Sequence, residues 1–522
     1  MRIPAFALLT AALVADGAWA APAPRPDDPV FTRFDGLASA GSDLSAWAAR
    51  ARFHGLDLAP DPIVQAYVAD RAAGKPYTPA AQQAVEAALE ATLERLVAEL
   101  PAAPRTVPVL NDPDTPFYLS PDVTWRSAPP RTASPETIAA ARAAARAGTL
   151  DDFLTRLLPP HPQYLRLVLA AERYAELCAA GGWRSVSRPK VLKRRGWRPP
   201  PEVAAAFQDR LQREGYYPPA GAVASGVWDD ATEAALAAFR SAHQVPQKGI
   251  DEDDLIAALN VACEERLATL VTNVKRWRVT AWRGEQTFVE VNLAAQELRY
   301  WRDGALVMQQ RTIVGSPKWY FDQDLGRRLN VHATPILADA ISRIVVNPIW
   351  AVPPRIAKNE IDVEVAKDPT WLEKHRMQLV TSPRGRTYIQ AAGADNSLGL
   401  IKILFPNDED VYLHDTPKKG AFKLAVRALS HGCVRVQNAV DFGMALLSAD
   451  AQAAGKPFDE AGLRARTGHG GSIIIDLAAQ VPVFLEYYTA SVDDAGQVRF
   501  HPDIYAYDAE LTLPPPKKRA GK

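Results

Sequence analysis

The sequence has no excess of charge of either sign, few cysteines, and no apolar run after its first residues that approaches a membrane span. Among 522 residues, Lys and Arg number 60 and Asp and Glu also number 60, so no net field attracts the chain to nucleic acid or to an anionic membrane. Gly-rich loops of the P-loop or dinucleotide-binding type are absent. These absences argue against nucleotide chemistry and nucleic-acid partners, while the length predicts roughly three to four domains.

The N-terminus has the pattern of a secretory signal peptide. Arg2 precedes an apolar run from Ile3 to Val14, too short to span a bilayer, and Ala18-Trp19-Ala20 fits the small-x-small cleavage rule. We expect cleavage after Ala20 and an exported, soluble mature chain. The alternative is an uncleaved segment, which is the one route by which we expect the chain to be held at a membrane.

Three cysteines are few for an exported chain. An oxidising compartment favours disulfides, yet an odd number leaves at least one thiol unpaired within a monomer. The absence of a C-x-x-C pair argues against a thiol-disulfide oxidoreductase. Cys178 and Cys263 lie in Ala-rich helical contexts, where we expect small buried apolar side chains; whether they pair is left open. Cys433 lies in a different kind of sequence.

Hydrophobic periodicity divides the chain into helical and β-rich parts. Up to about Trp183 the pattern is helical, with Thr78-Pro79 and Ser134-Pro135 as helix starts. A basic, Pro-rich linker precedes a unit of three short helices. Beyond residue 284 a period of two predicts antiparallel strands, interrupted by a helical insertion that is a candidate lid.

The sequence therefore predicts a multidomain α+β protein with a mainly antiparallel β catalytic domain. The expected divisions are a signal peptide (1–20), a helical scaffold domain (21–196, completed by 262–280), a three-helix domain (197–261), a β-rich domain (284–491) with a lid at about 347–380, and a frayed C-terminal tail (492–522).

Cys433 lies in "LSHGCVRV", between a glycine and a valine and two residues after His431. A thiolate attacks an acyl carbon far better than a thiol, so a nucleophilic cysteine needs a partner that takes its proton. His414 closes the apolar stretch "DVYLH". It is our candidate base, because a side chain on a neighbouring strand approaches the sulfur more squarely than one on the same strand.

Neighbouring residues fit the same chemistry. A base needs a group that orients its other ring nitrogen, and we expect a backbone carbonyl at or near Asp415, whose carboxylate projects to the opposite face of a strand. The amides of Gly432 and Cys433 are candidate donors to an oxyanion. Arg435 shares the face of Cys433 and is placed to hold a substrate carboxylate.

Two other interpretations stay open. Cys433 as a buried thiol with His414 as a core histidine is one, and a zinc site formed by His414, His431 and Cys433 is the other. No H-E-x-x-H motif or paired cysteine accompanies them. We therefore follow the nucleophile interpretation, and we expect neither a metal ion nor an organic cofactor.

Two motifs, "YLHDTP" (Tyr412–Pro417) and "SHGCVRV" (Ser430–Val436), resemble the signature of the peptidoglycan L,D-transpeptidase family. The segments "NPIWAVPP", "GLIKILFPN", "VPVFLEYYTA" and "DIYAYD" are similar to its large periplasmic branch. Residues 202–260 resemble a peptidoglycan-binding domain. The resemblance implies a catalytic domain with a lid, a helical scaffold and a wall-binding module.

Carried onto this sequence, the resemblance implies Cys433 as nucleophile and His414 as base. His431 is left outside this essential pair, because some members of the branch have Ser at that place. The supporting residues that we expect are Gly432 and Asp415 for oxyanion binding and orientation, and Arg435, Tyr412, Trp350, Ser430 and His431 for substrate binding.

The reaction that the resemblance implies is acyl transfer at the third residue of a peptidoglycan stem, with release of the terminal D-Ala and formation of a 3→3 cross-link. The acceptor stays open among a second stem, a lipoprotein, a D-amino acid and water. A wall-bound cysteine carboxypeptidase and an inactive wall-binding scaffold are the alternatives. The expected partners are stem peptides and glycan strands in the periplasm, with other cell-wall synthesis proteins as further candidates.

Overall fold

The computed structural model describes most of the chain between residues 29 and 508. The expected signal peptide (1–20) and the last residues of the expected tail (509–522) lie outside the described residues. In the described part, no helix is long and apolar enough to cross a membrane. Within 29–508, the residues not described are 34–35, 76–77, 102–131, 192–197, 218–223, 281, 283, 319, 323–326, 330–331 and 383–384.

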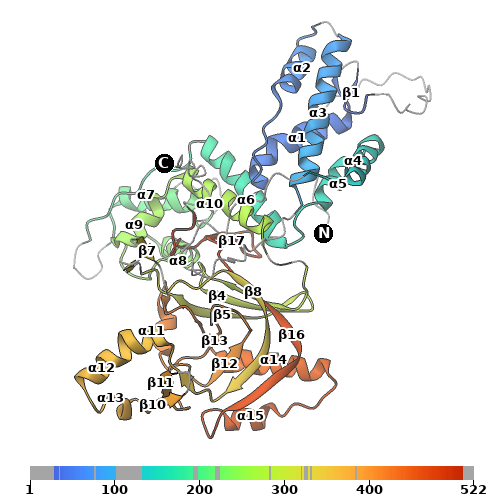
Figure 1. Cartoon of the computed structure of the whole chain (residues 1–522). Helices are drawn as coiled ribbons and strands as arrows, with labels where there is room; N and C mark the ends of the chain where they lie inside the picture. The colour runs from blue at the N-terminus through green and yellow to red at the C-terminus, as the bar shows by residue number, and fades with distance from the viewer. Residues whose placement is uncertain are drawn as a thin grey trace, which may run out of the picture.

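The N-terminal part is helical (Figure 1), and its helices pack around an apolar core to which later segments also contribute. Thr78 and Ser134 cap helices as predicted, since their hydroxyls accept hydrogen bonds from the backbone N–H groups of Ala81 and Thr137. The elements are β1 (Thr32–Arg33), β2 (Gly36–Leu37), α1 (Ser39–Arg50), the 3₁₀ helix η1 (Ala51–His54), α2 (Pro62–Ala72), α3 (Pro79–Glu99), α4 (Pro135–Ala147), α5 (Leu150–Arg156) and α6 (Pro162–Ala179).

A small helical unit follows, and the chain then returns to the first core. The unit consists of α7 (Pro201–Arg213), α8 (Asp230–Ala242) and α9 (Asp253–Asn260), with a separate core that includes Phe207 and Phe239. Helix α10 (Cys263–Arg278) packs against α6 and adds Leu270 and Trp277 to the first core.

A disulfide joins Cys178, in the last turn of α6, to Cys263 at the start of α10. The question of pairing, which the sequence left open, is thus answered: Cys263 is buried as expected, Cys178 is half-buried, and the two are bonded to each other. Alanine-rich helical context describes the packing around a cysteine but not its partner, which here lies 85 residues away in sequence. Cys433 is the free cysteine.

The second half of the chain is built on a mixed, mainly antiparallel sheet of nine strands, which confirms the α+β prediction. The order is β14-β5-β15-β13-β12-β8-β16-β3-β4, and an additional pairing of β4 with β5 closes eight of these strands into a barrel (Figure 1). The strands are β3 (Phe288–Asn292), β4 (Glu297–Arg302), β5 (Ala305–Gly315), β8 (Leu337–Val346), β12 (Ile401–Leu404), β13 (Leu413–His414), β14 (Ala428–Ser430), β15 (Val434–Val436) and β16 (Ile473–Glu486).

Further helices and short strands surround the barrel. Helix α14 (Ala439–Ala453), which the sequence analysis missed, packs on β12 and β16, with α15 (Glu460–Arg466) following it. A short hairpin, β6 (Tyr320–Asp322) and β7 (Arg327–Leu329), and the 3₁₀ helix η5 (Lys419–Lys423) complete this part.

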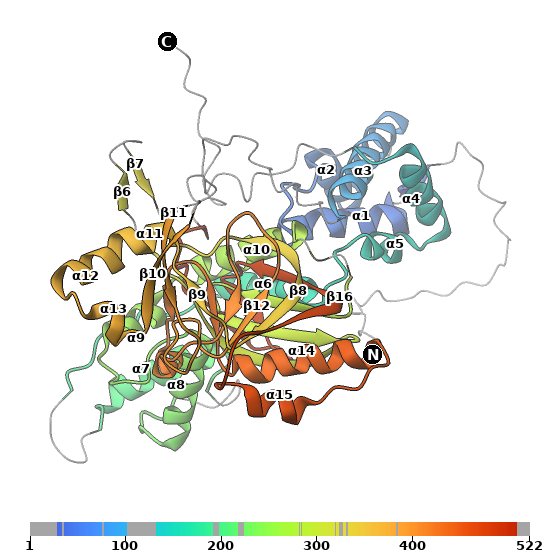
Figure 2. The same ribbon diagram turned by 60° about the horizontal axis from the view of Figure 1, so that its bottom comes forward.

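The lid stands to one side of the barrel and α14 and α15 to the other (Figure 2). It continues beyond Val380, the expected end, because β10 pairs with β11 along its whole length and β11 pairs with β9. A small core containing Val352, Ile361 and Tyr388 holds it together. Its elements are β9 (Trp350–Ala351), α11 (Pro354–Ile356), the π-helix η4 (Ala357–Ile361), α12 (Asp362–Lys367), α13 (Trp371–Lys374), β10 (Met377–Ser382) and β11 (Gly385–Gln390).

The expected frayed tail is wrong for residues 492–508. Strands β17 (Ala490–Val492) and β18 (Val498–Phe500) form a hairpin, and the side chains of Phe500 and Tyr505 are buried. The Gln163 side chain of α6 donates to Val492 O (2.6 Å) and accepts from Val492 N (3.0 Å). Its amide thus makes the two hydrogen bonds that a neighbouring strand would make. Pro and charge in the last residues suggested fraying, but the aromatic side chains before them provide enough buried area to order the segment.

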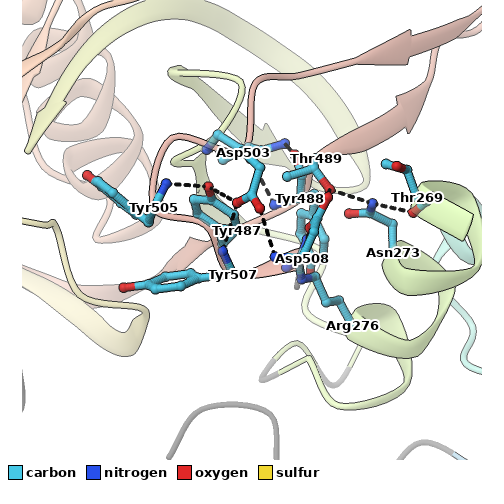
Figure 3. Close-up of polar contacts among 12 residues, drawn as sticks. Thr269, Asn273, Arg276, Tyr487, Tyr488, Thr489, Asp503, Tyr505, Tyr507 and Asp508 are labelled. Carbon is cyan, nitrogen blue, oxygen red and sulfur yellow. Dashed lines mark hydrogen bonds and ion pairs between the residues drawn. The ribbon is translucent and has the colours of Figure 1, made fainter. Parts of the chain in front are cut away.

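Polar contacts join this C-terminal segment to α10 (Figure 3). The buried guanidinium of Arg276 pairs with Asp508 (2.6 Å) and donates to the hydroxyl of Thr489 (3.0 Å). Asn273 donates to the same hydroxyl (2.8 Å). Because a buried cation left without its partners is costly, these contacts favour one arrangement of helix and barrel.

Counting reactive thiols tests the cysteine assignment. Alkylation of the unfolded, unreduced protein should add one label, on the peptide that contains Cys433. After reduction with dithiothreitol, mass spectrometry should show three labels, since three cysteines are present. The Cys433→Ala variant is the control and should take up no label before reduction and two labels after it. Three labels before reduction would contradict the disulfide.

Candidate active site

Cys433 lies in the short loop between β14 and β15, where two strands bring other polar side chains beside it. Strand β13 pairs with β15 in parallel and places His414 opposite Arg435. Strand β12 pairs with β13 and places Lys402 opposite His414. Residues opposite each other on neighbouring strands point to the same face, so the barrel sets Lys402, His414 and Arg435 in one row near the thiol.

The Cys433 side chain is half-buried and partly reachable from solvent. Its thiol donates to the carbonyl of Asp410 (3.6 Å). Burial raises the pKa of Cys433, whereas hydrogen bonding from Tyr412 and the charges of Lys402 and Arg435 act in the opposite direction. The site thus contains donors and cations that favour a thiolate once substrate or rotation releases it from Asp410.

His414 is buried, and burial together with Arg435 lowers its pKa to about 3, so the ring is neutral near pH 7. Backbone groups of Asp415 and Leu398 oppose that shift. Within the described residues, Nδ1 of His414 has no partner in good hydrogen-bond geometry, and the ring makes no hydrogen bond to the Cys433 sulfur. The two predicted catalytic residues are therefore not hydrogen-bonded in this state, and the strand register pairs His414 with Arg435, two residues after Cys433.

Asp415 has a structural role on the far side of His414. Its carboxylate accepts from Leu400 N (3.0 Å) and pairs with Lys419. The carboxylate is thus directed away from the ring, as expected, and backbone groups remain the ring's neighbours.

Hydrogen bonds within the loop before the nucleophile engage two groups that the sequence analysis assigned to the site. Ser430 is buried; its hydroxyl donates to Cys433 O (2.6 Å) and accepts from Gly432 N (3.2 Å). Ser430 therefore shapes the loop, and the Gly432 amide already has an acceptor. Gly432 has a φ of 124°, a conformation that side-chain-bearing residues rarely adopt, which explains a glycine beside the nucleophile.

Thr334 fixes the peptide bond that precedes Cys433, and the sequence analysis missed it. Its buried hydroxyl donates to Gly432 O (2.7 Å) and accepts from Gly315 N (2.8 Å). In a trans peptide the C=O and the next N–H point in opposite directions. Holding Gly432 O on one side therefore directs the Cys433 N–H to the other, and no acceptor for that N–H lies within the described residues.

Tyr505 ties Thr334 to the C-terminal segment. The Tyr505 hydroxyl accepts from Thr334 N (3.1 Å) and donates to Gly315 O (2.8 Å). Figure 3 shows Tyr505 beside Tyr487, whose hydroxyl accepts from Tyr505 N (2.9 Å). Gly315 permits this approach, because a Cβ there would lie 2.6 Å from Thr334 N.

The lid touches the nucleophile loop through His431. Nε2 of His431 lies 2.6 Å from a carboxylate oxygen of Glu360 on the π-helix η4, and its ring meets that of His332 edge-on (centroids 4.6 Å apart). Arg355 of α11 bonds to His332 (3.1 Å). The side chain expected to bind substrate is thus bound by the lid in this state.

The remaining predicted side chains are divided between lid and site. Trp350 packs against the lid's own core, so its ring supports the lid. The Tyr412 ring lies near that of His414 (5.6 Å between centroids), and the Lys402 ammonium lies 3.7 Å from the Tyr412 ring centroid. Tyr412 and Arg435 therefore lie at the candidate site, together with Lys402, which the sequence analysis missed.

Two family models match separate parts of the chain. Residues 286–442 match the L,D-transpeptidase catalytic domain, named YkuD, and residues 23–170 match a scaffold domain. A curated relative from Haemophilus influenzae, whose name gives it provisionally as an L,D-transpeptidase, is 30% identical over 260 residues, 47% of this chain and 49% of the relative. The chain thus spans about half the length of that relative.

Solved structures of L,D-transpeptidases are more distant. That from Xylanimonas cellulosilytica is 18% identical, with a TM-score of 0.19, and the match covers 54% of this chain and 92% of that one. That from Mycobacterium smegmatis is 13% identical, with a TM-score of 0.18, and the match covers 39% and 59%. Neither similarity supports an inference about this chain.

The Thr334 hydroxyl provides a test of the loop geometry. Thr334→Val should slow acylation of Cys433 by a β-lactam about 10- to 10²-fold, because acylation passes through an oxyanion that the Cys433 N–H must meet. Alkylation by iodoacetamide forms no oxyanion and should change little. Thr334→Ser is the matched control and should restore acylation. Equal losses of both reactions in the folded Val variant would show that Thr334 supports the thiol itself.

Proposed function

We propose that this chain, whose residues 286–442 match the L,D-transpeptidase catalytic domain, is a cysteine acyltransferase that makes 3→3 cross-links between peptidoglycan stems. The observation that carries the proposal is the free, half-buried thiol of Cys433 within that domain, on a glycine turn and beside the cations of Lys402 and Arg435. A buried structural cysteine needs none of these neighbours.

In the first step, the Cys433 sulfur attacks the carbonyl carbon of the third stem residue. A C–S bond forms, the C–N bond to the terminal D-Ala breaks, and the departing amine takes up the proton that the thiol lost. The Cys433 N–H, directed by Thr334 and Gly432, is the donor for the oxyanion.

His414 is the base of this step. Its neutral ring can accept the thiol proton, and rotation about χ1 of Cys433 takes the sulfur from Asp410 O to another staggered position. Hydrogen bonds between catalytic groups often form only when substrate is bound, so the resting contact with Asp410 is compatible with this role.

In the second step, an amine of another stem attacks the thioester, the C–S bond breaks, and the amine proton returns to the thiol by way of His414. Water at the same position would give a carboxypeptidase instead. The lid favours the amine by excluding water, since Glu360 holds it against His431 directly beside the nucleophile loop.

The other parts fit a role at the cell wall. A scaffold domain covers residues 23–170, and the three-helix unit α7–α9 is the proposed peptidoglycan-binding module. The Cys178–Cys263 disulfide supports export to an oxidising compartment such as the periplasm. Stem peptides and glycan strands are the proposed ligands.

Products from purified disaccharide-tetrapeptide decide among the alternatives. Mass spectrometry should show a cross-linked dimer that has lost one D-Ala. Tripeptide alone would indicate a carboxypeptidase, and unchanged tetrapeptide from a folded protein would indicate a wall-binding scaffold without activity.

Substitution of the two catalytic residues tests the mechanism. Cys433→Ala should abolish turnover and labelling by a carbapenem, whereas His414→Ala should lower turnover about 10²-fold or more, as expected for loss of a general base. Wild-type protein should gain the mass of one carbapenem on the Cys433 peptide. Turnover that survives in Cys433→Ala would refute the nucleophile, and normal turnover in His414→Ala would refute the base.

The contact between lid and loop is tested at Glu360. Glu360→Gln weakens the pairing with His431 and should raise the share of hydrolysed tripeptide at least about two-fold, while acylation by a small β-lactam changes little, because only the acceptor step needs a dry site. Glu364→Gln is the matched control, since Glu364 pairs with Lys367 within the same lid. An unchanged product ratio would show that this contact does not govern acceptor choice.

A further inference from the structure

Two cations beside the nucleophile form no ion pair with a carboxylate in the part of the chain that the structure describes. Neither the ammonium of Lys402 nor the guanidinium of Arg435 makes a hydrogen bond or ion pair with any described residue, and Nε of Arg435 is buried without a partner. Both side chains are half-buried. Asp410 acts on Lys402, but its side chain is exposed and forms no ion pair with it. Removing a charge from water is costly unless it is paired, so an anion that enters the site beside Lys402 and Arg435 would be stabilised by both.

The strand register of the barrel places both cations near the Cys433 thiol. Lys402 and Arg435 stand opposite His414 on the strands that flank β13, and both act on the Cys433 thiol. The Tyr412 ring, 3.7 Å from the Lys402 ammonium, restricts that flexible side chain through a cation–π contact. The charge of Lys402 is therefore held near the sulfur.

We propose that Lys402 and Arg435 form a carboxylate-binding subsite that receives the terminal carboxylate of the departing residue of the donor stem. This inference rests on the proposed function and names a recognition element for its first step. Arg435 supplies a planar pair of donors and Lys402 a point charge from the other side.

Covalent geometry makes the terminal carboxylate the fitting anion. In a tetrapeptide stem only one nitrogen and one Cα separate the attacked carbonyl carbon from the carboxylate carbon, a distance of about 4 Å at most. Any group that binds this carboxylate must therefore lie beside the nucleophile, as these two cations do. A stem extended by one residue has an amide there, which leaves both cations unpaired.

A second role for the same charges is stabilisation of the thiolate, and the two roles have different consequences. A carboxylate subsite distinguishes donors by their terminal group. Thiolate stabilisation affects all donors, and alkylating reagents, equally.

The experiment compares disaccharide-tetrapeptide with the same molecule carrying a C-terminal D-alaninamide. For the wild type, kcat/KM should be about 10- to 10²-fold higher for the acid, the scale expected for charge-assisted hydrogen bonds. In the Lys402→Met variant, which keeps an apolar side chain, most of that preference should be lost, because kcat/KM falls much further for the acid than for the amide. Lys456→Met, at an exposed lysine beyond α14, is the matched control and should keep the preference.

Each outcome is decisive. A wild type that processes both donors equally, or a Lys402→Met variant that loses activity equally on both, overturns the subsite while leaving the transpeptidase proposal intact. Slower alkylation of Lys402→Met by iodoacetamide together with an equal loss would assign Lys402 to the thiolate. A folded wild type that processes neither donor refutes the proposed function. Circular dichroism of each variant excludes misfolding as the cause of a loss. Arg435→Gln tests the second cation in the same way.

Discussion

Closure of the sheet by β5 is the constraint on which the site depends. The first part of β5 pairs with β4, whereas Thr312 and Ile313 pair with β15 and Val314 and Gly315 pair with β14. One strand thus joins both edges of the sheet and holds both sides of the nucleophile loop. Because β15 is held there, β13 and β12 follow in register, and polar side chains from three strands meet at Cys433.

The C-terminal segment makes that geometry depend on the rest of the molecule. On one side this segment contacts α10, through Asp508 and Arg276 (Figure 3). On the other side it contacts the nucleophile loop, because Tyr505 bonds to Thr334 and Thr334 bonds to Gly432. The link is a series of buried hydrogen bonds, each of which would be costly to leave unmade. The scaffold helices and the catalytic barrel are therefore joined through polar contacts as well as through apolar packing.

The sequence predicted what local patterns encode. Alternating apolar residues identified strands. A capping Thr or Ser followed by Pro identified the starts of α3 and α4. Short motifs indicated Cys433 and His414 as candidates for the site. It could not predict contacts between distant residues: the Cys178–Cys263 pair, the closure of the barrel, or Thr334, which has no motif and acts through a hydroxyl that only the fold brings to Gly432. Ser430 is a similar case, because its place in the motif does not reveal that its hydroxyl bonds to the backbone of Gly432 and Cys433.

The disulfide has a mechanical consequence. It joins the end of α6 to the start of α10, and the whole unit α7–α9 lies in the loop that it closes. Tension transmitted along the chain between scaffold and barrel therefore passes through the sulfur–sulfur bond and not through the unit α7–α9. If that unit unfolds, the distance between the two ends of the loop does not increase. A single proteolytic nick anywhere between residues 178 and 263 likewise leaves the two pieces covalently attached.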